Sequence, residues 1–165
     1  MVAVGSGAAG HADVSRALGR LDPYSFFVVP ANEWNADFAV VGTTGAFLIA
    51  TCTLEGVARI GSRRPIVGDR AIKGVRRLRS GLRRFSARLT SSSMFAQCVP
   101  IVCFTAAIAG PPVDSAGVRF VKVADLARDI SARPGVQSNT RAQAAARVLG
   151  MHIAGDEGRH FTVRG

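Results

Sequence analysis

Cysteine is scarce in this sequence, and its few positions argue against a cysteine-based metal site. Only Cys52, Cys98 and Cys103 are present among 165 residues, without a Cys-x-x-Cys pair and without a histidine close in sequence. An odd number of separated thiols is typical of buried, reduced cysteines in a reducing compartment. We therefore expect free thiols and no zinc site.

Long hydrophobic runs are also lacking. The longest apolar run, residues 98–109, contains Pro100 and is too short to span a bilayer. The first ten residues are small and apolar but lack the basic n-region of a signal peptide. With 48% hydrophobic and 19% charged residues, the composition is that of a globular protein. We expect a cytoplasmic protein with no membrane span.

Acidic residues are nearly absent from the middle of the chain, which is where the net charge of +10 arises. Residues 51–90 hold eleven basic and two acidic residues, whereas residues 1–50 hold two basic and four acidic residues. Solubility alone does not explain a cluster of one sign. The clustering predicts an anionic partner, either nucleic acid or an acidic protein surface.

The basic segment has the periodicity of an amphipathic helix over residues 70–89, with Asp69 as its N-cap. Apolar residues recur every three or four positions at Ile72, Val75, Leu78, Leu82, Phe85 and Leu89. Seven of the eight basic residues around this stripe are arginines, whose planar guanidinium pairs well with phosphate. They are Arg70, Lys73, Arg76, Arg77, Arg79, Arg83, Arg84 and Arg88.

This helix predicts binding to DNA, RNA or a nucleoprotein with little sequence preference, because its basic residues would contact phosphates. Three alternatives compete with that interpretation. The helix could be an ordinary solvated face, it could bind an acidic protein partner, or it could lie on an anionic membrane. The apolar stripe is needed for the core, which argues against the membrane.

A β-hairpin is predicted before the basic segment. Two short apolar runs, residues 38–41 and 46–49, flank Gly42-Thr43-Thr44-Gly45. A GXXG loop can clamp RNA, but that loop joins two helices. Because the residues here would join two strands, we expect a hairpin turn.

The stretch from Asp37 to Cys52 resembles the core of the nuclease-related domain (NERD) family, a branch of the restriction-endonuclease-like PD-(D/E)XK superfamily. That family shows an Asp, a run similar to Val-Val-Gly-x-x-Gly-Val-Phe-Val-Ile, and then Asp/Glu-x-Lys. Asp37 matches the first acid, and residues 40–49 match the run. Ala50 stands at the position of the second acid and Cys52 at that of the lysine. The family's glutamate in the first helix falls at Gly10-His11 or at Asp13.

The resemblance implies an α/β fold with a restriction-endonuclease-like core, in which helices flank a mixed central sheet. It implies one domain over residues 11–149, between a mobile N-terminus at residues 1–10 and a C-terminal tail at residues 150–165. Further elements fit this order. Helices are expected at residues 11–21, 124–131 and 138–149, and strands at residues 24–29, 65–67, 98–107 and 118–123.

Nucleases of this superfamily bind Mg²⁺ through two acids, and a lysine helps to position water. Alanine cannot ligate a metal, and a thiol is too soft for Mg²⁺. The resemblance therefore implies a domain that has lost nuclease activity and uses no cofactor. The alternative is a divergent nuclease in which Asp37 holds Mg²⁺ or Mn²⁺ with Glu33 or Glu55, and these carboxylates are catalytic.

Overall fold

The predicted hairpin lies at the centre of the fold. The computed structural model describes residues 8–61, 64–91 and 98–150. In it, β2 (Phe38–Gly42) pairs antiparallel with β3 (Gly45–Cys52). Gly42 pairs with Gly45, so a two-residue turn of Thr43 and Thr44 joins the strands. The Gly-Thr-Thr-Gly segment is therefore a hairpin turn, as predicted.

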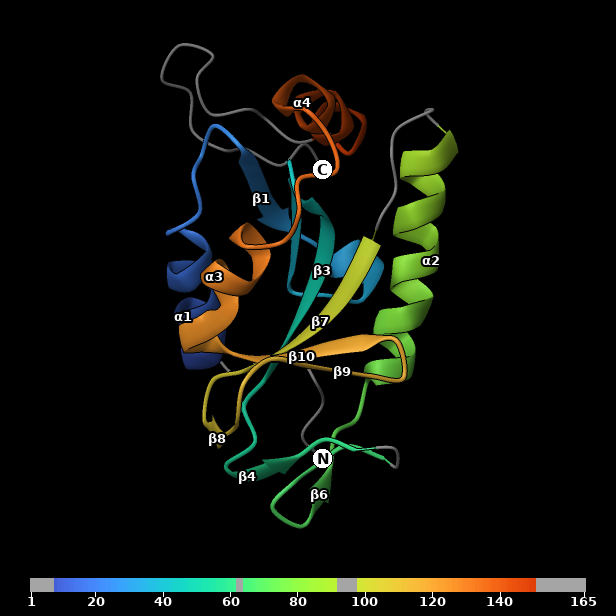
Figure 1. The fold of residues 1–165 in the computed structure, drawn as a ribbon. Coiled ribbons are helices and arrows are strands. Elements are labelled where there is room, and N and C mark those ends of the chain that lie inside the picture. Colours follow the sequence, from blue (N-terminus) through green and yellow to red (C-terminus); the bar gives the residue numbers. More distant parts are fainter. Residues whose placement is uncertain (1–7, 62–63, 92–97, 151–165) are drawn as a thin grey trace.

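A six-stranded mixed sheet extends from this hairpin on both sides (Figure 1). On one side, β1 (Phe26–Pro30) pairs antiparallel with β2. On the other, β7 (Cys98–Phe104) runs parallel to β3, and β10 (Val118–Lys122) runs parallel to β7. The short β9 (Val113–Ser115) closes that edge in the antiparallel direction. The expected α/β fold with a mixed sheet is confirmed.

Helices cover both faces of the sheet. In Figure 1, α1 (Ala8–Leu18) and α3 (Leu126–Ser131) lie on one side and α2 (Val75–Ser91) on the other. The fourth helix, α4 (Asn139–Val148), packs near α2 on the same face. Every residue of β3 is buried, because alternate side chains point into two separate cores.

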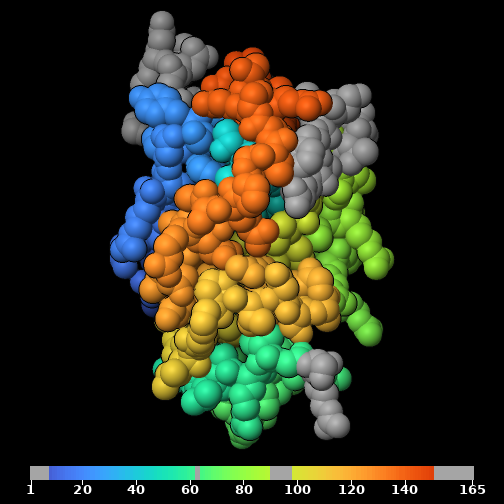
Figure 2. Space-filling view, viewed as in Figure 1, coloured from blue at the N-terminus to red at the C-terminus, as the bar shows by residue number. Residues whose placement is uncertain are grey.

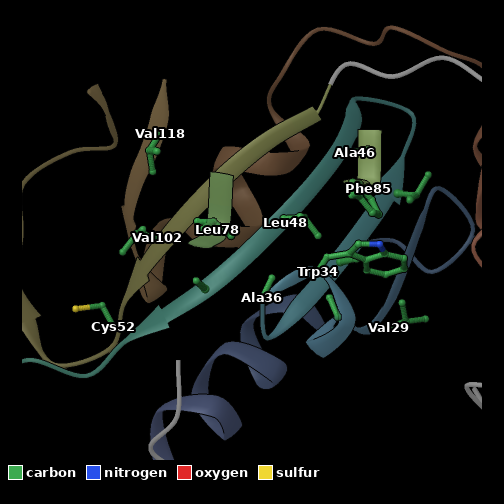
Figure 3. Packing of buried hydrophobic residues seen from close by; sticks show 14 of the residues in the cluster. Val29, Trp34, Ala36, Ala46, Leu48, Cys52, Leu78, Phe85, Val102 and Val118 are labelled. Carbon is green, nitrogen blue, oxygen red and sulfur yellow. The ribbon is translucent and has the colours of Figure 1, made fainter. Parts of the chain in front are cut away.

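The core beneath α2 contains two aromatic rings that contact each other, Trp34 and Phe85, as Figure 3 shows. Trp34 comes from the short 3₁₀-helix η1 (Asn32–Trp34), and Phe85 comes from α2. The ring centroids lie 5.0 Å apart with an interplanar angle of 68°, an edge-to-face arrangement that aromatic pairs prefer. The pair anchors α2 to the segment that leads into β2.

Gly81 allows α2 to approach this segment closely. A Cβ atom built at Gly81 would overlap the backbone carbonyl oxygen of Trp34. The oxygen belongs to the backbone, so it cannot move aside as a flexible side chain can. Only glycine fits at this point of the helix, even though glycine lowers the intrinsic stability of a helix.

A second, four-stranded sheet lies at one end of the molecule, as the lower part of Figures 1 and 2 shows. It contains β4 (Gly56–Arg59), β5 (Ile66–Val67), β6 (Arg70–Ala71) and β8 (Ala107–Ile108). The expected strand at residues 65–67 is therefore present as β5. The strand β6 then leads into the connection that precedes α2.

The prediction of a helix starting at residue 70 with an Asp69 cap was wrong. Residues 66–71 form the β5–β6 hairpin, and Asp69 lies in its turn. Gly68 and Gly74 have φ values of 61° and 88°, which are incompatible with a right-handed helix. Of the predicted basic residues, Arg70 therefore lies on β6 and Lys73 in the connection before α2.

Two other boundaries also differ from the prediction. The first helix begins at Ala8 and ends at Leu18, so residues 8–10 are helical and not part of a mobile terminus. Residues 124–131 divide into the 3₁₀-helix η2 (Val123–Asp125) and α3.

The last helix follows the prediction more closely. Ser138 caps α4, and its hydroxyl accepts a hydrogen bond from the Arg141 N–H at 3.2 Å. The predicted tail, apart from Gly150, lies outside the described residues. Within the described ranges, no helix is long and apolar enough to cross a membrane.

Replacing Gly81 by alanine should destabilise the protein. Alanine is favoured over glycine in a helix by about 1 kcal/mol, but the overlap with the Trp34 backbone must displace α2, so the cost lies at the upper end of the roughly 1–3 kcal/mol of overpacking and exceeds that gain. We expect a lower midpoint of urea unfolding for Gly81→Ala. The exposed neighbour Ser80 provides the control, since Ser80→Ala should leave the midpoint unchanged or raise it. A midpoint for Gly81→Ala equal to that of the wild type would contradict the close approach.

Candidate functional site

The exposed face of α2 carries a group of arginines, here called the arginine face. Its members are Arg76, Arg77, Arg83, Arg84 and Arg88, which are exposed, and Arg79, which is half-buried. The opposite side of the helix holds Leu78, Phe85 and Leu89, all fully buried. The apolar stripe therefore orients α2 so that its arginines point to solvent.

Among the residues that the structure describes, no acidic side chain forms a salt bridge with Arg76, Arg77, Arg79, Arg83 or Arg84. The salt bridges found there use Asp13, Asp114, Asp125 and Asp129, none with a partner on α2. Asp129 instead binds Arg119 at 2.6 Å, and this hydrogen bond raises the pKa of the guanidinium. These four acids pair with basic residues on and around α1, β10 and α3, so in the described part of the chain no salt bridge offsets the charge of Arg76, Arg77, Arg79, Arg83 and Arg84.

Basic residues continue beyond both ends of α2. Arg70 and Lys73, at the N-terminal side, are exposed. At the C-terminal end, the Arg88 side chain donates a hydrogen bond of 3.4 Å to the carbonyl oxygen of Val148 in α4. The neighbouring Arg147 is also exposed, on a helix that packs beside α2. The position of Arg147 could not be predicted from either segment alone, because it depends on the packing of α4 beside α2.

Asp37, the predicted metal ligand, is engaged by the backbone of β3. Its carboxylate accepts a hydrogen bond of 2.7 Å from the Thr51 N–H. Its own N–H donates to the Ile49 carbonyl oxygen at 2.9 Å. Asp37, whose side chain is half-buried, therefore extends the pairing of β2 with β3 by one residue before Phe38, the first residue of β2, which is a structural role.

The other two positions of the nuclease motif lie in the core. Ala50 and Cys52 are 2% and 1% exposed, in the cluster that also contains Leu78 and Val102 (Figure 3). Burial raises the pKa of the Cys52 thiol, so the sulfur is neutral at neutral pH. A neutral thiol beside an alanine offers no hard oxygen ligand, and these residues do not fit Mg²⁺ or Mn²⁺.

The alternative ligands Glu33 and Glu55 are both exposed, one in η1 and the other between β3 and β4. In the described part of the chain, no three His, Cys, Asp or Glu residues form a group able to hold a metal. Asp37, Glu33 and Glu55 are therefore not gathered into a three-carboxylate site.

The two positions considered for the family's first-helix glutamate also carry no ligand role in the structure. A Cβ at Gly10 would lie 2.6 Å from the Thr53 side chain and 3.2 Å from that of Thr51, so there is little room for a larger residue. Asp13 forms a salt bridge of 3.1 Å with Arg16 on the surface.

The Thr43-Thr44 turn is covered by the segment between α3 and α4. The Thr44 hydroxyl donates to the Ile130 carbonyl oxygen at 2.8 Å, and the Val136 N–H donates to the Thr43 carbonyl oxygen at 2.9 Å. The Gln137 side chain also donates to the Gly42 carbonyl oxygen. The carbonyl groups of Gly42 and Thr43 are thus occupied by hydrogen bonds within the protein.

Comparisons with known proteins identified no relative, since no protein-family model, curated protein or solved structure matches the chain. Its function is therefore inferred from its own residues.

Removing the Asp37 carboxylate should lower stability in proportion to the hydrogen bonding lost. A hydrogen bond to a charged group contributes about 1.5–3 kcal/mol, and one to a neutral group about 0.5–1.5 kcal/mol. We expect Asp37→Ala to be the less stable variant in urea unfolding and Asp37→Asn to be intermediate, because asparagine keeps an oxygen acceptor for the Thr51 N–H.

Exposed Glu33→Ala and Glu55→Ala serve as controls and should change stability by less than about 0.5 kcal/mol. A metal-binding role would give a different pattern. In that case Mn²⁺ would raise the melting temperature of the wild type, and both Asp37 variants and a glutamate variant would abolish the increase.

Proposed function

We propose that this chain is a NERD-like domain that has lost its nuclease centre and binds nucleic acid, or a nucleoprotein, through the arginine face of α2. The observation that carries the proposal is a helix face on which Arg76, Arg77, Arg79, Arg83 and Arg84 form no salt bridge with an acidic side chain among the described residues. Such a surface contacts phosphates, and phosphates carry no sequence information.

The NERD-like part of the proposal is supported by the hairpin from which the resemblance arises. Both of its strands occur where expected, and a mixed sheet with helices on both faces is the architecture that the resemblance implies. A restriction-endonuclease-like core is thus part of the proposal. The burial of Ala50 and Cys52 in an apolar cluster supports the loss of the metal centre.

Reversing charge on the arginine face should abolish binding. We expect the wild type to bind random-sequence nucleic acid in fluorescence polarisation, with an affinity that falls steeply as salt is raised. Arg76→Glu with Arg83→Glu should lose this binding. A matched control is Arg16→Glu with Arg20→Glu, on α1 and in the turn that follows it. This variant has the same net charge as the α2 variant and should bind nearly as the wild type does. Equal losses in both variants would indicate a non-specific effect of net charge.

Parallel reactions with Mg²⁺ or Mn²⁺, analysed on a gel, test the two other functions. Cleavage that disappears in Asp37→Ala would support a divergent nuclease that uses Asp37 with Glu33 or Glu55. The absence of both binding and cleavage would support an acidic protein as the partner of the arginine face.

A further inference from the structure

The arginine face has two rows of side chains separated by small residues. At about 100° of rotation per residue, Arg76, Arg79 and Arg83 lie along one side of the exposed face of α2. Arg77 and Arg84 lie along the other side, followed by Arg88, which also contacts α4. Ser80 and Ala87, both exposed, lie between the rows. The centre of the face thus carries short side chains, and its two borders carry long cationic ones.

The two rows point about 100° apart around the helix axis, so their guanidinium groups diverge toward opposite borders of a groove that admits a helix. A helix with its side chains is about 10–12 Å across, and the major groove of B-form DNA is about 12 Å wide. From Arg76 to Arg83 the helix advances about 10 Å, which is enough to follow several phosphates along one strand. Each row can therefore reach a different strand of one duplex.

Single strands fit this face less well. Proteins that hold single strands usually stack bases on exposed aromatic side chains. Phe85, the aromatic residue of α2, is fully buried against Trp34. Tyr24, which is 68% exposed, belongs to the turn before β1 and not to α2. A single strand also offers one backbone to two rows of cations.

Double-stranded RNA fits less well than DNA, because the major groove of an A-form helix is deep and narrow. Ser80 and Ala87 add no amide or guanidinium along the centre of the face, where side chains would read base edges. The geometry therefore favours B-form DNA and contacts that depend little on sequence.

We propose that α2 binds along the major groove of B-form double-stranded DNA, with the Arg76/Arg83 row on one backbone and the Arg77/Arg84 row on the other. This inference rests on the proposed nucleic-acid function and specifies its ligand. It also distinguishes the two rows, since a duplex needs both rows at once.

The test compares four probes of the same length in fluorescence polarisation: a DNA duplex, its single strand, the matching RNA duplex and a DNA duplex of scrambled sequence. We expect the DNA duplex to bind at least about tenfold more tightly than the single strand or the RNA duplex, because it engages both rows. The scrambled duplex should bind equally well.

Row variants test the geometry directly. Arg76→Ala with Arg83→Ala, and separately Arg77→Ala with Arg84→Ala, should each lower the slope of log affinity against log salt by about 2, close to one unit for each lost phosphate contact. Arg16→Ala with Arg20→Ala is the control of equal charge change, and its slope should stay at the wild-type value. Circular dichroism of each variant verifies that the fold is intact.

The outcomes separate this inference from the proposed function. Preference for the single strand or for RNA, or a slope that responds to one row alone, would overturn the inference while leaving nucleic-acid binding in place. Binding to none of the four probes would overturn both. Duplex preference that requires both rows would support the inference.

Discussion

The close approach of α2 to η1 at Gly81 is the contact on which the arrangement of this molecule depends. It brings the helix backbone against the Trp34 carbonyl oxygen and sets the depth at which Phe85 and Leu78 enter the core. The same contact sets the rotation of the helix about its axis. Because the buried side is fixed, the side that carries Arg76, Arg77, Arg83 and Arg84 is fixed as well. A packing constraint inside the protein thus determines the pattern of charge outside it.

Asp37, Ala50 and Cys52, which only the resemblance relates to a metal centre, serve packing and backbone pairing in this chain. Ala50 and Cys52 fill the core beneath α2, and Asp37 completes the pairing of two strands. Meanwhile the acids near α3 and β10 are paired with nearby basic residues, whereas the arginines of α2 face solvent. Charge and packing are therefore assigned to opposite sides of the same helix, and each side constrains the sequence independently.

Sequence patterns predicted the elements with strong local signals. The hairpin at β2–β3, the buried strand β7 and the helix α4 have such signals in their own residues. The start of α2 was predicted too early because Ile72 continues the apolar stripe of the helix. In the structure Ile72 is buried, but it directly follows β6 and precedes the helix. Strands of two or three residues, such as β8 and β9, are too short to show a period. The role of Asp37 depends on a partner fourteen residues away, and that of Arg147 on the packing of two helices.

The covered turn between β2 and β3 has a consequence for the order in which the chain folds. Its partners Ile130 and Gln137 are separated from Thr44 and Gly42 by 86 and 95 residues. Contacts so distant in sequence close large loops and slow folding. During synthesis, the central hairpin is made early, yet the carbonyl groups of Gly42 and Thr43 lack these partners until residues 136 and 137 have left the ribosome. The segment after α3 therefore joins the turn late in synthesis. A chain that ends before it lacks the hydrogen bonds to the turn between the two central strands β2 and β3.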